Sequence, residues 1–242
     1  MQLAVDIGNS YSKAALYKEE QLVEFVYFNE QQPEALSAIF EKYGNPSQGM
    51  IASVRNISPE FLTFLHSVCP IKILDHTTSL PFKITYSTPQ TLGRDRIAAV
   101  AAAFGRYPGK NVLVIDMGTC ITYDILQADR LYPGGSISPG ITMRLKAMHH
   151  FTDKLPLAEV DGSASLTGRD TLSALQSGAV WGVQKEIEGI IDAYSSIYEE
   201  LTVLIGGGDN KYFDKKFRIS IFAASNLVIE GLKIIMDYNE IG

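Results

Sequence analysis

Apolar and polar positions follow two kinds of pattern along the first half of the chain. Short apolar runs predict buried strands, and apolar residues spaced three and four apart predict amphipathic helices. Ser58, Pro59 and Glu60 give one helix an N-cap, a proline at its first position and an acidic first turn. The pattern predicts strands at 2–7, 12–17, 22–28, 49–54 and 71–74, and helices at 33–43 and 58–68.

The second half continues this alternation of strands and helices. Before it, the polar residues 76–92, which include two prolines, predict a long loop or an extended arm. No low-complexity linker separates the halves, so we expect two closely packed α/β halves, residues 1–108 and 109–242, with a cleft between them. The pattern predicts strands at 111–116, 120–126, 202–205 and 219–222, helices at 93–104, 141–151, 170–198 and 226–238, and glycine-rich loops at 134–140 and 206–209.

One segment of the sequence occurs twice. Leu3–Ser10 returns in altered form as Leu113–Cys120, and in both copies an apolar run ends in Asp, one apolar residue, Gly and a small polar residue. A hydroxyl follows at the same offset, Ser12 in the first copy and Thr122 in the second. Asp-x-Gly is common turn chemistry, and here it places a carboxylate at the end of a strand. The repetition predicts two similar halves that each offer a phosphate- or metal-binding loop.

Composition and charge narrow the class of protein. The 242 residues are 46% hydrophobic and 20% charged, as in ordinary globular proteins. A net charge of −6 argues against a nucleic-acid surface, which requires a basic stripe. We find no signal peptide and no apolar stretch of about 18 residues that could span a membrane. Cys69 and Cys120 form no disulfide or zinc pattern, so a reduced, cytoplasmic location is expected.

Three glycine-rich stretches, 6–13, 134–140 and 206–209, follow a predicted strand or precede a predicted helix. Glycine lets the backbone approach an anion closely, and successive N–H groups or a helix N-terminus then bind phosphate oxygens. Each stretch alone is also compatible with a plain turn. Neither the P-loop motif nor the dinucleotide fingerprint occurs. Together the three stretches predict a polyphosphate ligand, most simply ATP.

Two carboxylates and a lysine fit such a ligand. Asp6 and Asp116 offer the hard oxygen ligands that suit Mg²⁺ or a monovalent cation, which would neutralise phosphate charge. Lys13 offers a point charge to the phosphates, although a solvated lysine on a strand is an equally ordinary interpretation.

The segment Gly93–Arg96 is the best candidate for catalysis. A helix N-terminus stabilises the anionic form of Asp95, which could then accept a proton from an attacking hydroxyl. Arg96 offers a planar fork suited to a carboxylate. The alternative is that Asp95 only caps the helix and that Arg96 lies on the surface. The four histidines show no metal-binding spacing.

In their order and spacing, these motifs resemble the type III pantothenate kinase family over essentially the whole chain. That family is similar in fold to the actin, heat-shock-70 and sugar-kinase superfamily, which implies an α/β protein of two ribonuclease-H-like halves around a nucleotide cleft. The motifs are Asp6–Ser10, Gly93–Arg96, Asp116–Thr119, Gly134–Gly140, Asp170–Thr171, Gln176–Gly178, Gly206–Asp209 and Asn226–Leu232.

The resemblance implies ATP-dependent phosphorylation of pantothenate to 4′-phosphopantothenate, the first step of coenzyme A biosynthesis, by a cytoplasmic enzyme that is usually a homodimer. It implies that Asp95 is the catalytic base and that Asp116 binds a monovalent cation (K⁺ or NH₄⁺). On its carboxylate chemistry, Asp6 is expected to contact the Mg²⁺ that accompanies ATP. ATP would be bound by Asp6, Ile7, Gly8, Asn9, Ser10, Tyr11, Ser12, Lys13 and Thr119, and pantothenate by Tyr86, Gly93, Arg94, Asp95, Arg96 and Thr171.

The sequence departs from the family pattern at Arg94, where the family usually has Ala. A long cation at this position either points to solvent or changes the charge of the pocket. Ser10 for Thr and Cys120 for a small residue are milder changes. Two other functions remain open: a kinase that acts on another small hydroxyl substrate, and a nucleotide-binding regulatory accessory factor without turnover.

Overall fold

A computed structural model describes residues 1–242 except 10, 30–32, 161–163, 210–220, 225 and 241–242. The chain divides into two compact units, of which the first comprises 1–109, 129–134 and 226–242 and the second 110–128 and 135–225. The predicted boundary at 108/109 lies beside the observed one. Residues 129–134 and 226–242, which the sequence assigned to the C-terminal half, belong to the first unit.

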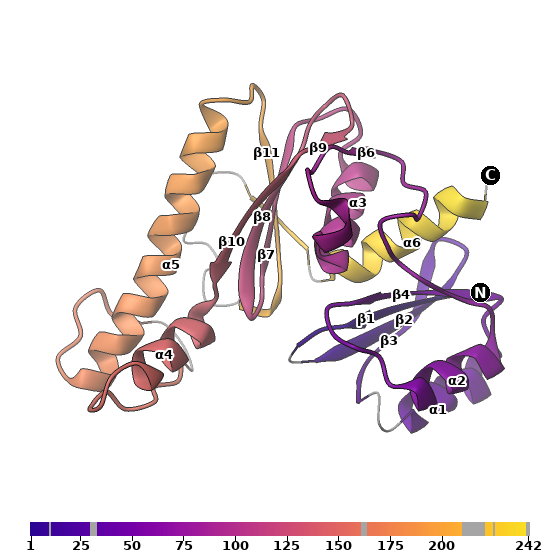
Figure 1. Cartoon of the computed structure of the whole chain (residues 1–242), viewed down its shortest axis with the longest axis horizontal. Helices are drawn as coiled ribbons and strands as arrows, with labels where there is room; N and C mark the ends of the chain where they lie inside the picture. Colours follow the sequence, from indigo (N-terminus) through magenta and orange to yellow (C-terminus); the bar gives the residue numbers. More distant parts are fainter. Residues whose placement is uncertain (10, 30–32, 161–163, 210–220, 225, 241–242) are drawn as a thin grey trace. The chain divides into compact units, whose positions relative to one another are not determined.

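The first unit contains a five-stranded sheet in the order β3-β2-β1-β4-β5 (Figure 1). β1 pairs antiparallel with β2 and parallel with β4, so the carboxyl ends of β1 and β4 meet at one edge of the sheet. The strands are β1 (Gln2–Ile7), β2 (Ser12–Lys18), β3 (Gln21–Phe28), β4 (Gln48–Ser53) and β5 (Ile71–Ile73).

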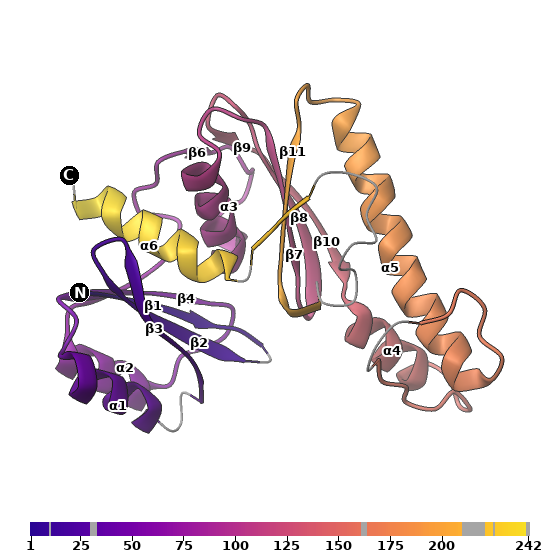
Figure 2. The ribbon, with the colours of Figure 1, turned by 180° about the vertical axis from the view of Figure 1, so that it is seen from behind.

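Helices cover both faces of this sheet (Figure 2). Leu3, Val5 and Ile7 of β1 pack with α1 (Glu34–Tyr43) and α2 (Pro59–Val68) in one core. Since side chains alternate along a strand, the even-numbered residues of β1 face the other side. That side carries α3 (Arg94–Arg106) and α6 (Leu227–Glu240).

The second unit repeats this design. Its sheet has the order β10-β8-β7-β11-β12, with β7 antiparallel to β8 and parallel to β11. Leu113, Ile115 and Met117 pack under α4 and α5. The elements are β7 (Val112–Met117), β8 (Cys120–Leu126), β10 (Gly134–Pro139), α4 (Ile141–His150), α5 (Thr171–Ser195), β11 (Thr202–Gly206) and β12 (Ile221–Ala223).

The two sheets have the same strand order, so β1 corresponds to β7, β2 to β8 and β4 to β11. The predicted α/β fold of two similar halves is therefore confirmed. The repeated sequence forms most of the equivalent strands β1 and β7, and its second copy continues through the turn after β7 to the first residue of β8. No helix among the described residues is long and apolar enough to cross a membrane.

Three predicted elements differ in the structure. Residues 134–140 were expected to form a loop, but 134–139 are strand β10, next to β8. A side chain at Gly135 would overlap the backbone of Tyr123 in β8, so this glycine serves a close approach of two strands. The segment 76–92 is not wholly irregular, because it contains β6 (Lys83–Ile84), paired with β9 (Leu131–Tyr132), and the 3₁₀ turn η1 (Pro89–Thr91). The strand predicted at 219–222 overlaps β12 at 221–222, and 219–220 lie outside the described residues.

Candidate active site

The predicted catalytic segment forms the first turn of α3. Gly93 is the N-cap, and Asp95 is the second helical residue. The half-buried carboxylate of Asp95 accepts a hydrogen bond from the backbone N–H of Arg96, with an N–O distance of 2.8 Å. A Cβ at position 93 would lie 2.5 Å from Oδ1 of Asp95, so only glycine leaves room for the carboxylate in this position. The helix N-terminus favours the anionic form that a general base needs.

Arg96 is buried rather than on the surface, with 5% of its area exposed. Its guanidinium carbon lies 5.9 Å from the centroid of the Tyr86 ring. The pairing of β6 with β9 fixes the chain just before Tyr86, where the N–H of Thr85 donates to the carbonyl of Tyr132 at 2.9 Å. The structure thus brings Tyr86 and Arg96, both predicted to bind substrate, into contact beside Asp95.

Arg94 takes a position that neither sequence-based alternative described. Its Nη1 donates to the carbonyl of Leu92 at 2.6 Å, and its Nη2 donates to the carbonyl of Gln90 at 3.3 Å. The guanidinium is therefore tied to the backbone of η1 and of the residue that follows it. This side chain braces the segment that leads into the first turn of α3.

The connection between β1 and β2 places the predicted phosphate loop at the end of β1. The N–H of Gly8 donates to the carbonyl of Tyr11 at 3.2 Å and closes the turn. Asp6 pairs with Lys13 across the two strands, and only 7% of Asp6 is exposed. Because cross-strand neighbours point to the same face, Asp6 and Lys13 share the face of α3 and α6. Ser10 lies outside the described residues.

Ser12 lies on the other face of the same sheet. It pairs with Ile7 and is 2% exposed. In the second unit, Thr122 pairs with Asp116, so the two hydroxyls that stand at the same offset in sequence lie on different faces of their sheets. Four residues separate the paired residues Ile7 and Ser12, whereas three separate Met117 and Ile121, so an equal offset in sequence gives opposite faces.

Sequence reasoning missed Arg55 at this loop. Nη2 of Arg55 lies 3.5 Å from Oγ of Ser12, and the Ser53 hydroxyl bonds to both the carbonyl and the N–H of Arg55. The parallel pairing of β1 and β4 brings this arginine to the loop. The only sequence signal was a cation directly after a predicted strand. Tyr11 and Asn9 of the loop are exposed, and the ring of Tyr11 meets Tyr27 edge-on.

The matching turn of the second unit is tight. The N–H of Gly118 donates to the carbonyl of Cys120 at 2.9 Å. Asp116 is half-buried one residue before the end of β7, and Thr119 is exposed in the turn. The carbonyl of Thr119 accepts the N–H of Gly140 at 3.0 Å. The predicted cation ligand and the predicted phosphate contact are thus three residues apart on one backbone segment.

Thr171 is the exposed first residue of α5. Asp170 caps this helix in a capping box with Ser173, and the backbone and hydroxyl hydrogen bonds from Ser173 lower the pKa of Asp170. The predicted site residues therefore belong to two units. Asp6 to Lys13, Tyr86 and Gly93 to Arg96 lie in the first, and Asp116, Thr119 and Thr171 lie in the second.

The donor chemistry fits hard cations better than transition metals. Among the described residues, no group of three or more His, Cys, Asp or Glu side chains could hold a metal ion. Asp6 and Asp116 each lie at the end of a strand beside a turn with backbone carbonyls. Carboxylate and carbonyl oxygens, completed by water and phosphate, suit Mg²⁺ or a monovalent cation.

The fold is shared with proteins of known structure. A 2-dehydro-3-deoxygalactonokinase-like protein from Sinorhizobium meliloti has a TM-score of 0.59 at 15% identity, and the alignment covers 99% of each chain. A protein from Campylobacter jejuni described as a Baf family transcriptional activator has a TM-score of 0.64 at 23% identity over 99% of this chain and 100% of that one. These likenesses establish the fold class.

Sequence comparison gives the family. The model of the type III pantothenate kinase family matches residues 2–193. A type III pantothenate kinase of Bacteroides fragilis (strain YCH46) is 44% identical over 240 residues, covering 99% of this chain and 98% of that protein. The same enzyme of Christiangramia forsetii is 40% identical over 241 residues, covering 99% of both. The chain belongs to the type III pantothenate kinase family.

Proposed function

We propose that this protein transfers the γ-phosphate of ATP to pantothenate, giving 4′-phosphopantothenate and ADP, the first step of coenzyme A biosynthesis. The observation that carries the proposal is the family match over residues 2–193, together with relatives of the same name that align over 99% of the chain. The first turn of α3 supports it, because a helix N-terminus favours the anionic carboxylate that a general base needs.

Asp95 accepts the proton of the primary hydroxyl of pantothenate as that oxygen attacks the γ-phosphorus. The bond from phosphorus to the bridging oxygen breaks, and ADP leaves. Arg96 fixes the pantothenate carboxylate or the transferred phosphate, and its burial beside Tyr86 supports a fixed orientation. Phosphoryl transfer depends mainly on positioning and charge neutralisation, which these residues can supply.

The two equivalent turns hold the nucleotide phosphates in this proposal. Residues 6–13 bind ATP in the first unit, with Lys13 as a point charge and Asp6 toward Mg²⁺, and Thr119 binds ATP in the second. Asp116 binds K⁺ or NH₄⁺. These cations neutralise phosphate charge when they are bound. Support comes from the equivalent places of Asp6 and Asp116 at the ends of β1 and β7.

Pantothenate lies against Tyr86, Gly93, Asp95 and Arg96, with Thr171 as a further contact. Arg94 takes part through the loop that it braces, since its guanidinium already binds two carbonyls of the preceding segment. This arrangement supports a role for Arg94 in the shape of the pocket rather than in its charge.

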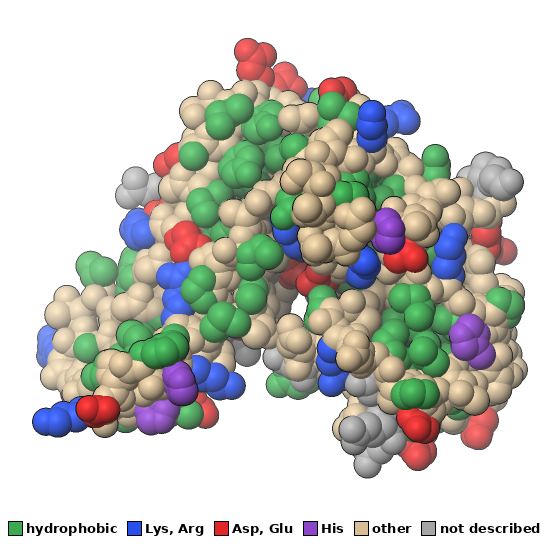
Figure 3. All heavy atoms as spheres, in the orientation of Figure 1, with side chains coloured by type: hydrophobic (Ala, Val, Ile, Leu, Met, Phe, Trp, Pro, Cys, Tyr) green, Lys and Arg blue, Asp and Glu red, His purple; other side chains and the backbone are tan. Residues whose placement is uncertain are grey.

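A homodimer in the cytoplasm completes the proposal. Exposed apolar side chains occur from α4 to the start of α5, and Figure 3 shows hydrophobic side chains over this end of the second unit. Such a surface supports self-association. The cysteines are unpaired, in keeping with a reducing compartment. The exposed residues are Met143, Phe151, Leu157, Leu166 and Leu172.

The decisive experiment measures ADP release by the purified protein with ATP and Mg²⁺, with and without pantothenate and with and without K⁺. We expect turnover that requires pantothenate and rises with K⁺. The variant Asp95→Asn should lose about 100-fold or more in kcat while still binding ATP. Turnover only with another hydroxyl substrate would point to a different kinase. ATP binding without turnover under any cation would point to a regulatory factor. Near-normal turnover of Asp95→Asn would refute the assignment of Asp95 as the catalytic base.

A further inference from the structure

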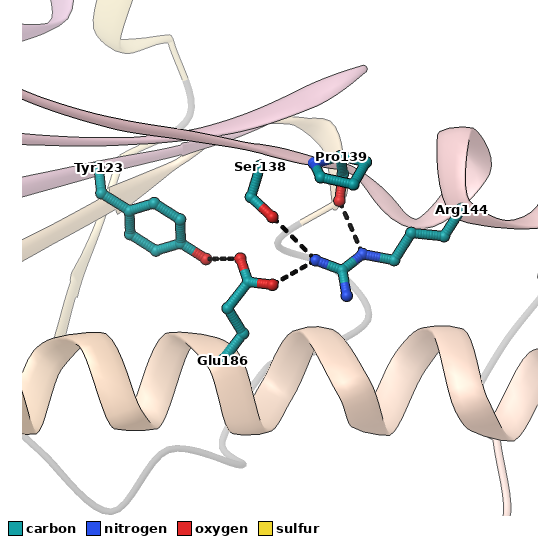
Figure 4. A network of polar contacts seen from close by, with 5 residues as sticks. All are labelled: Tyr123, Ser138, Pro139, Arg144 and Glu186. Carbon is teal, nitrogen blue, oxygen red and sulfur yellow. Dashed lines mark hydrogen bonds and ion pairs between the residues drawn. The ribbon is translucent and has the colours of Figure 1, made fainter. Parts of the chain in front are cut away.

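Arg144 of α4 binds the end of strand β10 in the second unit (Figure 4). Its Nε donates to the carbonyl of Pro139 at 2.8 Å, and its Nη2 donates to Oγ of Ser138 at 3.0 Å. Both acceptors lie in the last two residues of β10, just before α4 begins. One guanidinium therefore fixes the backbone where the strand passes into the helix.

Glu186 of α5 holds this guanidinium in place. Its Oε2 forms an ion pair with Nη2 of Arg144, and its Oε1 accepts the hydroxyl of Tyr123 at 2.8 Å. Tyr123 is fully buried in β8, and the side chains of Arg144 and Glu186 are 22% and 25% exposed. Figure 4 shows Glu186 between the two partners. The network thus joins β8, β10, α4 and α5 through charged and neutral hydrogen bonds.

The residue that follows this junction touches the predicted phosphate turn. Gly140 donates its N–H to the carbonyl of Thr119 at 3.0 Å. A Cβ at Gly140 would overlap the carbonyl oxygens of Gly118 and Thr119, so the two backbones lie in direct contact. Because of this contact, we expect a displacement of residues 138–140 to shift Thr119 and its neighbours.

We propose that Arg144 and Glu186 are positioning residues that hold the Gly118–Cys120 turn in the geometry that binds the phosphates of ATP. This inference rests on the proposed role of Thr119 in ATP binding. Phosphate contacts depend steeply on position, and a shift of about 1 Å costs a large part of an enzyme's rate. Neither residue touches the nucleotide in this account, and both act through Pro139 and Gly140.

The test compares Arg144→Met, Arg144→Lys and Glu186→Gln with the unchanged enzyme in steady-state kinetics. We expect Arg144→Met to raise the KM for ATP about tenfold, with the KM for pantothenate changed less than about twofold. Arg144→Lys should recover part of the loss, because an ammonium can still reach Glu186. The double variant Arg144→Met with Glu186→Gln should lose little more than either single variant, because the two residues act as one unit.

Lys185→Met is the matched control. Lys185 pairs with Glu188 on the exposed side of the same helix, and its loss should leave both KM values unchanged. Melting temperatures of all variants separate general destabilisation from the expected kinetic change.

Thr119→Ala separates a failure of this inference from a failure of the proposed site. If Thr119→Ala raises the KM for ATP but folded Arg144→Met does not, the positioning role is refuted and the phosphate turn stands. If neither variant changes the KM for ATP, both the positioning role of Arg144 and the phosphate-binding role of the Gly118–Cys120 turn are refuted. If Arg144→Met raises both KM values equally, or if Arg144→Lys recovers nothing, the pair has only a structural role and the inference fails.

Discussion

The carboxylate of Asp95 occupies space that a side chain at Gly93 would fill, since a Cβ there would lie 2.5 Å from Oδ1. The N-cap glycine of α3 thus gives the proposed base its orientation by leaving a space for it. Glycine is not required here by its backbone angles, because φ of Gly93 is −57°. The requirement comes from the neighbouring carboxylate alone.

Gly93→Ala should therefore lower kcat by about 10- to 100-fold while the KM for ATP stays close to that of the unchanged enzyme. The methyl group displaces the Asp95 carboxylate, whereas the turns that carry the phosphate contacts are untouched. Gly189→Ala is the control, because a Cβ at this exposed helical position meets nothing within 4 Å. That change should stabilise the protein by up to about 1 kcal/mol and leave kcat unchanged. Equal kcat values for Gly93→Ala and the unchanged enzyme would contradict the packing argument.

Arg94→Ala introduces the residue that the family usually carries. It removes two hydrogen bonds to the carbonyls of Gln90 and Leu92, so we expect a loss of about 1 kcal/mol and a melting temperature lower by about 2–4 °C. The looser segment should raise the KM for pantothenate several-fold. Arg106→Gln at the other end of α3 breaks an ion pair with Glu230 and serves as control, with reduced stability and an unchanged KM. An unaltered KM in Arg94→Ala would mean that the brace does not shape the pocket.

Asp116→Asn should weaken the response to K⁺. The neutral amide is a poorer ligand for a hard cation, so we expect half-maximal activation to need about tenfold more K⁺. Titration of activity with KCl, at ionic strength held constant with a large organic cation, measures this shift. Asp153→Asn removes an exposed carboxylate after α4 and should leave the K⁺ response as it is. The same K⁺ titration in Asp116→Asn as in the unchanged enzyme would remove Asp116 from the cation site.

Glu186→Gln should alter the dependence of stability on pH. Burial raises the pKa of Glu186, but hydrogen bonds from Arg144, Ser138 and Tyr123 outweigh it and lower the pKa below its usual value. A carboxyl with a lowered folded-state pKa contributes stability above its unfolded pKa of about 4.3, and this contribution is lost as pH falls through the folded value.

At pH 7 we therefore expect Glu186→Gln to melt about 2–4 °C lower than the unchanged protein, which corresponds to about 1 kcal/mol for a partly exposed pair. The difference should shrink as the pH is lowered below about 4. Melting curves between pH 3 and pH 8 measure it. Glu200→Gln, which removes an exposed partner of Lys110, should show a much smaller effect. A difference that is constant over this range would argue against a charge effect.

The local pattern of apolar and polar residues predicted most of the helices and strands. Apolar runs and helical spacing located the strands and helices because each element buries one continuous face, as in β1 and α1. Residues 134–139 were missed because glycine, serine and proline are typical of loops. This segment forms a strand because it packs closely against Tyr123 of β8. Tyr123 is distant in sequence, so the composition of residues 134–139 does not indicate the pairing.

The candidate site was predictable only in part. Local helix signals predicted that Asp95 lies in the first turn of a helix, and in the structure it lies in the first turn of α3. Ser12 and Thr122 lie on opposite faces of their sheets because the strand registers differ by one residue. One extra residue in the loop is enough to cause this difference. Arg144 and Glu186, which pair between two helices, are 42 positions apart in sequence, and no local rule indicates this pairing.

The last helix of the chain lies on its first strand. α6 packs against β1 and α3, so on the face that these two helices share the first sheet stays only partly covered until α6 is made. During synthesis, α4, α5 and the second sheet emerge while β1 still lacks α6 on this face. Residues 226–240 of the first unit are thus made after the whole of the second unit, and the packing of α6 on β1 has to wait until the second sheet has been synthesised.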